Sequence, residues 1–134
     1  MKRSWLILLI FVVFEIAITT LAVPQATIKM ISIDELKNML NNPDLTIIDV
    51  RYEKDWEKSN MKITGAVRED YMRVETWADK YSKSRFIVLY CACPDERTSA
   101  RVARELLDRG FTNVRVLKGG WDAWVKAGYP TEKN

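Results

Sequence analysis

The stretch that decides the fold runs from Phe86 to Arg109 and reads FIVLYCACPDERTSARVARELLDR. It opens with a continuous apolar run, residues 86–90, of the length and composition typical of a strand buried on both faces. The run breaks at residues 91–96, and a helical pattern follows. Its apolar stripe consists of Val102, Ala103, Leu106 and Leu107. We therefore predict a strand, a short loop and a helix.

Both cysteines of the chain, Cys91 and Cys93, lie in this loop. Open α/β sheets bind ligands where a strand ends and a helix begins. A helix N-terminus offers free N–H groups and a partial positive charge, which favour a thiolate or a bound anion. We therefore expect the functional site, including an anion-binding loop, at Cys91, Ala92, Cys93, Pro94, Asp95, Glu96 and Arg97.

Strands and helices alternate along the rest of the chain. Besides 86–90, strands are expected at 45–50, 63–67 and 114–117. Helices are expected after the capping box formed by Ser32 and Glu35, at 53–58, within 71–81 and from 121. Gly110 is expected to end the helix of the central stretch. This alternation predicts an α/β fold with a parallel sheet covered on both faces. The strand ending at Asp49 and the strand ending at Cys91 should then share one edge of the sheet.

Composition excludes several kinds of site. The 134 residues, 48% of them hydrophobic, suffice for one domain with a core, and the net charge of +3 is scattered, so no nucleic-acid partner is expected. The chain has no histidine, which excludes a Ser-His-Asp triad, a Cys-His pair and imidazole metal ligation. Two cysteines alone cannot form a structural zinc site. We expect no metal and no organic cofactor.

The N-terminal segment 1–22, MKRSWLILLIFVVFEIAITTLA, carries Lys2 and Arg3 before a long apolar run. It is typical of a cleaved signal peptide, but it is also long enough for an uncleaved transmembrane anchor, and both remain open. Either would place the rest of the chain outside the cytoplasm, in the periplasm or cell envelope, or secreted. Residues 23–29 are expected to form a linker and residues 30–130 the domain.

Four segments together resemble the rhodanese family: residues 45–51, 63–67, 87–91 and 117–124. The resemblance implies a three-layer α/β domain with a central, mostly parallel sheet flanked by helices. It also implies a sulfurtransferase whose cysteine carries a persulfide and passes sulfur to a thiol or cyanide, with loop N–H groups cradling the sulfur. The expected partners are a small sulfur donor or a protein thiol acceptor, and we expect a monomer.

The loop departs from the family pattern. It contains no glycine, Glu96 stands where the family often has arginine, and Pro94 has no N–H to donate. The negative charges of Asp95 and Glu96 should raise a thiol pKa and repel thiosulfate. A histidine common in the family is replaced by Lys62.

The loop also allows two alignments. Counting from the strand end makes Cys91 the nucleophile, whereas counting back from Gly110 makes it Cys93. We favour Cys91, because the strand end fixes where a side chain emerges, and keep Cys93 as the alternative. Asp49 and Arg51 are expected to give structural support as an ionic pair after their strand.

Three other functions remain open. The acidic loop suggests a non-catalytic binding or sensing module on the same scaffold. A thiol redox module could use Cys91 and Cys93 in a strained, readily reduced disulfide. The spacing from Cys91 to Arg97 is also that of cysteine-dependent phosphatases with a related fold.

Overall fold

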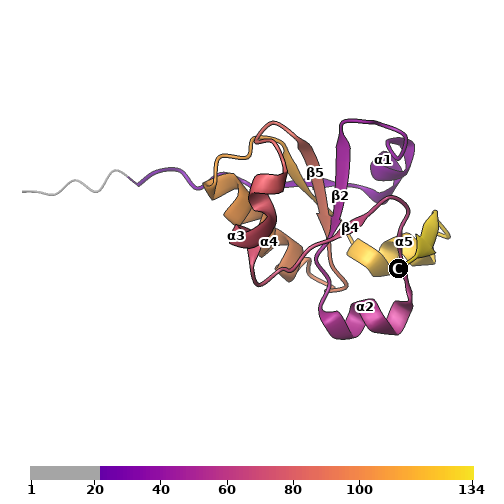
Figure 1. The fold of residues 1–134 in the computed structure, drawn as a ribbon. Coiled ribbons are helices and arrows are strands. Elements are labelled where there is room, and N and C mark those ends of the chain that lie inside the picture. Colours follow the sequence, from indigo (N-terminus) through magenta and orange to yellow (C-terminus); the bar gives the residue numbers. More distant parts are fainter. Residues whose placement is uncertain (1–21) are drawn as a thin grey trace, which may run out of the picture.

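The computed structural model describes residues 22–134, so the predicted signal peptide or anchor lies, except for Ala22, outside the described residues. A sheet in the order β1-β6-β5-β2-β4, with every neighbouring pair parallel, forms the centre (Figure 1). Its strands are β1 (Lys29–Ile31), β2 (Leu45–Asp49), β4 (Val67–Arg68), β5 (Phe86–Tyr90) and β6 (Val114–Leu117). The predicted parallel sheet is confirmed.

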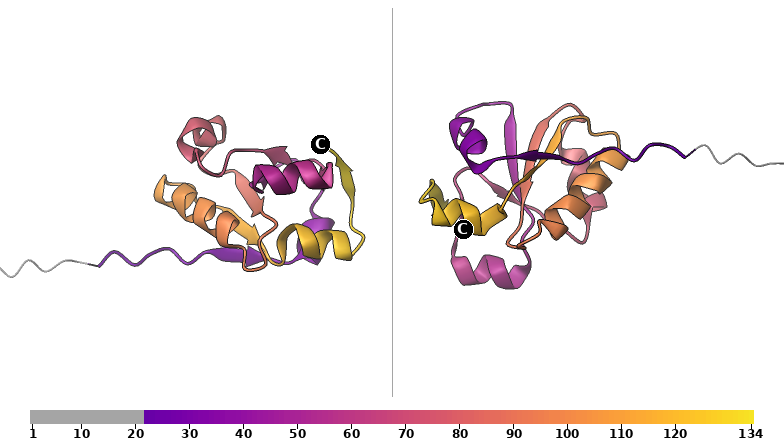
Figure 2. Two further views of the ribbon diagram at one scale, coloured as in Figure 1. Left: turned by 90° about the horizontal axis from the view of Figure 1, so that it is seen from below. Right: turned by 180° about the vertical axis from the view of Figure 1, so that it is seen from behind.

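Helices cover both faces of this sheet, which gives three layers (Figures 1 and 2). The helix α1 (Ile33–Asn38) and the helix α5 (Gly120–Lys126) lie on one face. On the other face lie α3 (Val74–Trp77), the short 3-10 helix η1 (Ala78–Lys80) and α4 (Arg97–Asp108). The helix α2 (Glu53–Ser59) follows β2 at the carboxyl edge of the sheet.

The strand β5 explains why the central stretch decides the fold. Ile87 and Leu89 are buried in the core beneath α4, whereas Val88 and Tyr90 are buried in the core beneath α5. Alternate side chains of a strand point to opposite faces, so a run without polar residues is needed to fill both cores. The predicted strand at 86–90 is confirmed with the same bounds.

One predicted strand was wrong in its extent. Residues 63–67 form no single strand, because Gly65 turns the chain with φ +78°. The strand β3 (Met61–Ile63) ends before the turn and pairs antiparallel with β7 (Thr131–Lys133) in a separate two-stranded sheet, while β4 begins after it. The pattern also missed β1 and β7, since strands of three residues are too short to show a period.

Helix ends follow the expected residues. Ser32 accepts from the N–H of Glu35, whose carboxylate accepts from the N–H of Ser32, so the capping box of α1 is confirmed. Gly110, with φ +91°, follows α4 and donates its N–H to Leu107. Within residues 22–134, no helix has the length and apolar character needed to cross a membrane.

Candidate active site

The carboxyl edge of the sheet brings the predicted site residues together. β2 and β5 are adjacent and parallel, with Asp49 opposite Tyr90, so the segments after both strands begin side by side. The expectation that the ends at Asp49 and Cys91 share one edge is confirmed. The N–H of Val50 donates to the carbonyl of Tyr90 and extends the pairing to the end of both strands.

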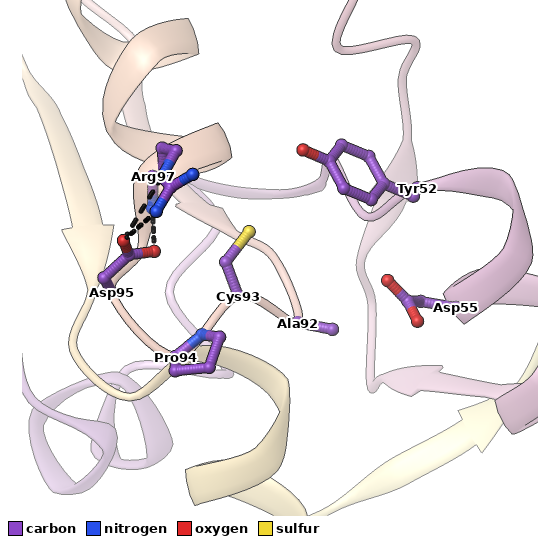
Figure 3. A pocket seen from close by; sticks show the side chains of 7 residues that line it. All are labelled: Tyr52, Asp55, Ala92, Cys93, Pro94, Asp95 and Arg97. Carbon is purple, nitrogen blue, oxygen red and sulfur yellow. Dashed lines mark hydrogen bonds and ion pairs between the residues drawn. The ribbon is translucent and has the colours of Figure 1, made fainter.

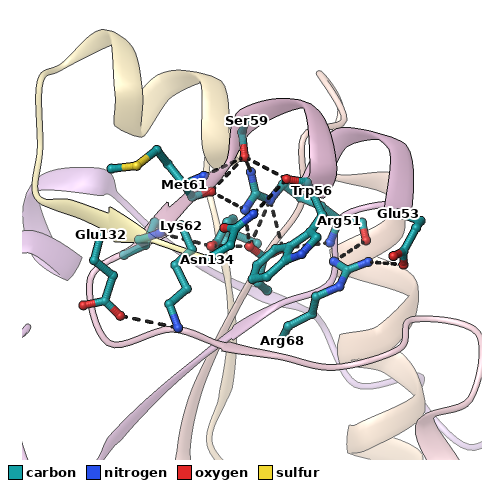
Figure 4. A network of polar contacts seen from close by, with 12 residues as sticks. Arg51, Glu53, Trp56, Ser59, Met61, Lys62, Arg68, Glu132 and Asn134 are labelled. Atoms are coloured by element: carbon teal, nitrogen blue, oxygen red, sulfur yellow. Dashed lines mark hydrogen bonds and ion pairs between the residues drawn. The ribbon is translucent and has the colours of Figure 1, made fainter.

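Arg51 and Asp49 form an ion pair that is wholly inside the protein. Their side chains are both 0% exposed and lie 2.6 Å apart. The Arg51 guanidinium also donates to the Ser59 hydroxyl (2.9 Å) and to the carbonyl of Met61 (2.8 Å) (Figure 4). It lies 4.2 Å from the ring centre of Trp121. The pair thus joins β2 to α2, β3 and α5, as a structural support would, and presents no free group to a substrate.

A pocket of about 310 Å³ opens beside the cysteine loop. Seven residues line it: Tyr52, Asp55, Ala92, Cys93, Pro94, Asp95 and Arg97. Figure 3 shows the Cys93 sulfur pointing into the space between Arg97 and Tyr52. The Cys93 thiol donates a hydrogen bond to the hydroxyl of Thr98 in the first turn of α4 (3.2 Å).

Cys91 has the opposite environment. It is 1% exposed and belongs to the core beneath α4. Its sulfur lies 3.5 Å from the Ser99 hydroxyl and accepts from the N–H of Cys93 at 3.4 Å. Burial, together with a hydrogen bond to the Cys93 thiol, raises the pKa of Cys91 to about 11, although Ser99 opposes the shift. At neutral pH Cys91 is a buried neutral thiol.

Glu96 takes the conformation that a loop glycine would supply. Its φ of 53° and ψ of 21° are left-handed. Its N–H donates to the carbonyl of Cys93 (3.3 Å), and its carboxylate accepts the N–H of Gly119 (2.6 Å). The carboxylate is therefore bound to the turn before α5 and is not among the groups that line the pocket.

Asp95 is paired with Arg97 at the mouth of the pocket (2.9 Å), where the arginine side chain is 81% exposed. Hydrogen bonds from the Arg97 side chain lower the pKa of Asp95, so the carboxylate is ionised and its charge is balanced. The sequence predicts two repelling carboxylates beside the thiol. The structure instead places one against a cation and the other, that of Glu96, on a backbone N–H.

The sequence did not indicate several groups that shape the site. Tyr52 and Asp55 reach the pocket from the α2 region, and no local pattern connects them to the cysteine loop. Trp121 donates its N–H to the carbonyl of Cys91 (2.9 Å). A Cβ on Gly120 would lie 2.3 Å from that carbonyl oxygen, so only glycine allows this approach. The paired glycines at 119–120 were the one signal for this contact.

Fold and site together define a small α/β domain that presents a thiol at the mouth of a pocket, between the end of a parallel strand and the start of a helix. The family model for the rhodanese-like domain matches residues 32–127. The chain therefore belongs to the rhodanese-like domain family.

Known relatives agree with this assignment. The thiosulfate sulfurtransferase GlpE of Coxiella burnetii is 30% identical over 103 residues, which cover 77% of this chain and 92% of GlpE. The chloroplastic thiosulfate sulfurtransferase 16 of Arabidopsis thaliana is 27% identical over 97 residues, covering 63% of this chain and 78% of the relative. Among solved structures, the Alr3790 protein from Anabaena sp. has a TM-score of 0.69 and 31% identity, covering 78% of this chain and 82% of that one. The predicted α/β fold is thereby confirmed.

Proposed function

We propose that this domain is a sulfurtransferase that carries sulfur as a persulfide on Cys93. One observation carries the choice of residue: of the two cysteines, Cys93 lines the open pocket and Cys91 is sealed in the core. The nucleophile is thus Cys93, the alternative kept open in the sequence, and Cys91 is part of the buried core that supports the loop. Similarity to thiosulfate sulfurtransferases supports a sulfane donor such as thiosulfate.

Two displacements make up the reaction. The Cys93 thiolate attacks the outer sulfur of thiosulfate, the bond between the two thiosulfate sulfurs breaks, and sulfite leaves with the electron pair. The enzyme then holds Cys93–S–S⁻. An acceptor thiolate or cyanide attacks the terminal sulfur, the sulfur–sulfur bond breaks, and the Cys93 thiolate returns. Neither step needs a metal or an external oxidant.

The surroundings of Cys93 suit this chemistry. The partial positive charge at the start of α4 favours the thiolate and the persulfide anion. The Thr98 hydroxyl, which accepts from the Cys93 thiol, can rotate and donate to a thiolate. Arg97 stands at the mouth of the pocket, where its charge offsets that of Asp95 on the path of an anionic donor.

The test is the intact mass of the purified protein after incubation with thiosulfate. The parent and Cys91→Ser should each gain one sulfur atom, and Cys93→Ser should gain none. Uptake by Cys93→Ser but not by Cys91→Ser would return the role to Cys91. No uptake by the parent would favour a binding module on the rhodanese scaffold.

We also propose that residues 1–22 direct the domain out of the cytoplasm, where as a monomer it exchanges sulfur with a small donor or a protein thiol. The basic start and the apolar run of this segment support the proposal. A reporter that works only in the cytoplasm, fused after Asn134, should be inactive. Full reporter activity would contradict the proposal.

A further inference from the structure

We propose that Glu96 is a positioning residue, which holds Cys93 in place for sulfur transfer by binding the cysteine loop (residues 91–96) to the turn at Gly119 and Gly120. The inference rests on the proposed function of Cys93. Its evidence is the backbone conformation of Glu96, the partner of its carboxylate and the contact that fixes the other end of the loop.

The backbone of Glu96 is in a conformation that its side chain disfavours. Among residues 22–134, Glu96 and Asn60 are the non-glycine residues with positive φ. Asparagine adopts this conformation readily, because its short polar side chain can bond locally, whereas glutamate has no such advantage. A residue persists in such a conformation only where its surroundings stabilise it.

The surroundings of Glu96 supply that stabilisation. The N–H of Gly119 donates to its carboxylate over 2.6 Å, a short bond to a charged acceptor. Its carbonyl accepts from the hydroxyl of Ser99 (3.1 Å) and the N–H of Ala100 (2.8 Å), and its N–H donates to the carbonyl of Cys93 (3.3 Å). The backbone of Cys93 is thus bonded directly to a residue whose side chain is fixed on a distant turn.

The first residues of α5, which follow Gly119, fix the opposite end of the loop. The N–H of Trp121 donates to the carbonyl of Cys91, and Gly120 leaves no room between the two segments. Cys93 lies between these two attachments. Removing the Glu96 carboxylate breaks the attachment to Gly119, so the Cys93 sulfur loses its alignment with a sulfur donor that still binds in the pocket. Such a loss lowers kcat and leaves KM nearly unchanged.

Three variants separate the carboxylate from the backbone. Glu96→Gln keeps an acceptor oxygen without the charge, Glu96→Gly relieves the backbone but removes the acceptor, and Glu75→Gln is a control on the exposed side of α3. Glu96→Gly should lower kcat for thiosulfate about tenfold with KM within about twofold, and Glu96→Gln should stay within about threefold of the parent. The control should match the parent. A Glu96→Gly variant as active as the parent would overturn the positioning role.

A second measurement does not depend on activity. The amide of Gly119 should exchange slowly with deuterium in the parent, because it donates to the Glu96 carboxylate, and should exchange faster in Glu96→Gly. A Gly119 amide that exchanges equally fast in the parent and in Glu96→Gly, in a protein that takes up sulfur, overturns the positioning role alone. A parent that takes up no sulfur overturns the proposed function, and the role in transfer with it.

Discussion

Replacing Arg51 with alanine should destabilise the domain more than any surface ion pair could. The change leaves the Asp49 carboxylate, which is 0% exposed, without its cation. Only the Tyr90 hydroxyl and the backbone N–H of residue 51 would still donate hydrogen bonds to this carboxylate. It also removes the donor to the carbonyl of Met61. Truncating one partner of a buried pair costs about 3–5 kcal/mol, which is a large fraction of the total stability of a small domain.

Urea denaturation followed by tryptophan fluorescence measures this loss. With a slope of about 2 kcal/mol per molar urea, the midpoint should fall by about 2 M. Arg109→Ala is the matched control, because Arg109 pairs with Glu105 on the surface of α4 and such pairs contribute about 0–1 kcal/mol. The double variant Asp49→Asn with Arg51→Met should lose less than Arg51→Ala, since it leaves no unpaired charge. Equal losses for Arg51→Ala and Arg109→Ala would refute the reasoning.

Two further predictions concern the cysteine loop. Because burial raises the pKa of Cys91 to about 11, iodoacetamide should alkylate the remaining thiol of Cys93→Ser slowly at pH 8 and faster as the pH rises toward 11. Fast alkylation of the folded variant at pH 8 would contradict the buried position of Cys91, and the urea-unfolded variant is the control. Gly120→Ala should lower the free energy of unfolding by about 2–4 kcal/mol, because the new Cβ would meet the carbonyl oxygen of Cys91. Gly128 also has a positive φ but has open space around it, so Gly128→Ala should cost only about 1 kcal/mol. Equal losses of stability in a thermal melt would show that the close approach at Gly120 is unimportant.

The sequence was informative where structure is local. The strand at 86–90, the capping box of α1 and the glycine after α4 each depend on neighbouring residues, and each was predicted correctly. Because Cys91 directly follows the end of the strand, its side chain was expected to point out of the sheet into the site. In the structure its carbonyl is bonded to Trp121 and its sulfur packs into the core, so the chain emerges into the pocket two residues later, at Cys93.

The conformation of Glu96 shows why the rest of the site was not predictable. A glutamate in a loop without glycine suggested a repelling charge beside the thiol. The acceptor role of its carboxylate depends on Gly119, which is far away in sequence and meets Glu96 only after the sheet and α5 have packed. Tyr52 and Asp55 likewise come to line the pocket opposite the loop only once β2 and β5 have paired.

The turn at Gly119 and Gly120 also determines when, during synthesis, the cysteine loop can reach its folded arrangement. Synthesis proceeds from the N-terminus, so residues 91–96 leave the ribosome before the turn that holds them. Until residues 119–126 follow, the segment that carries both thiols lacks the N–H groups of Gly119 and Trp121 that bind it in the folded protein. A chain shortened before that turn would keep every reactive group of the site and still lack its arrangement.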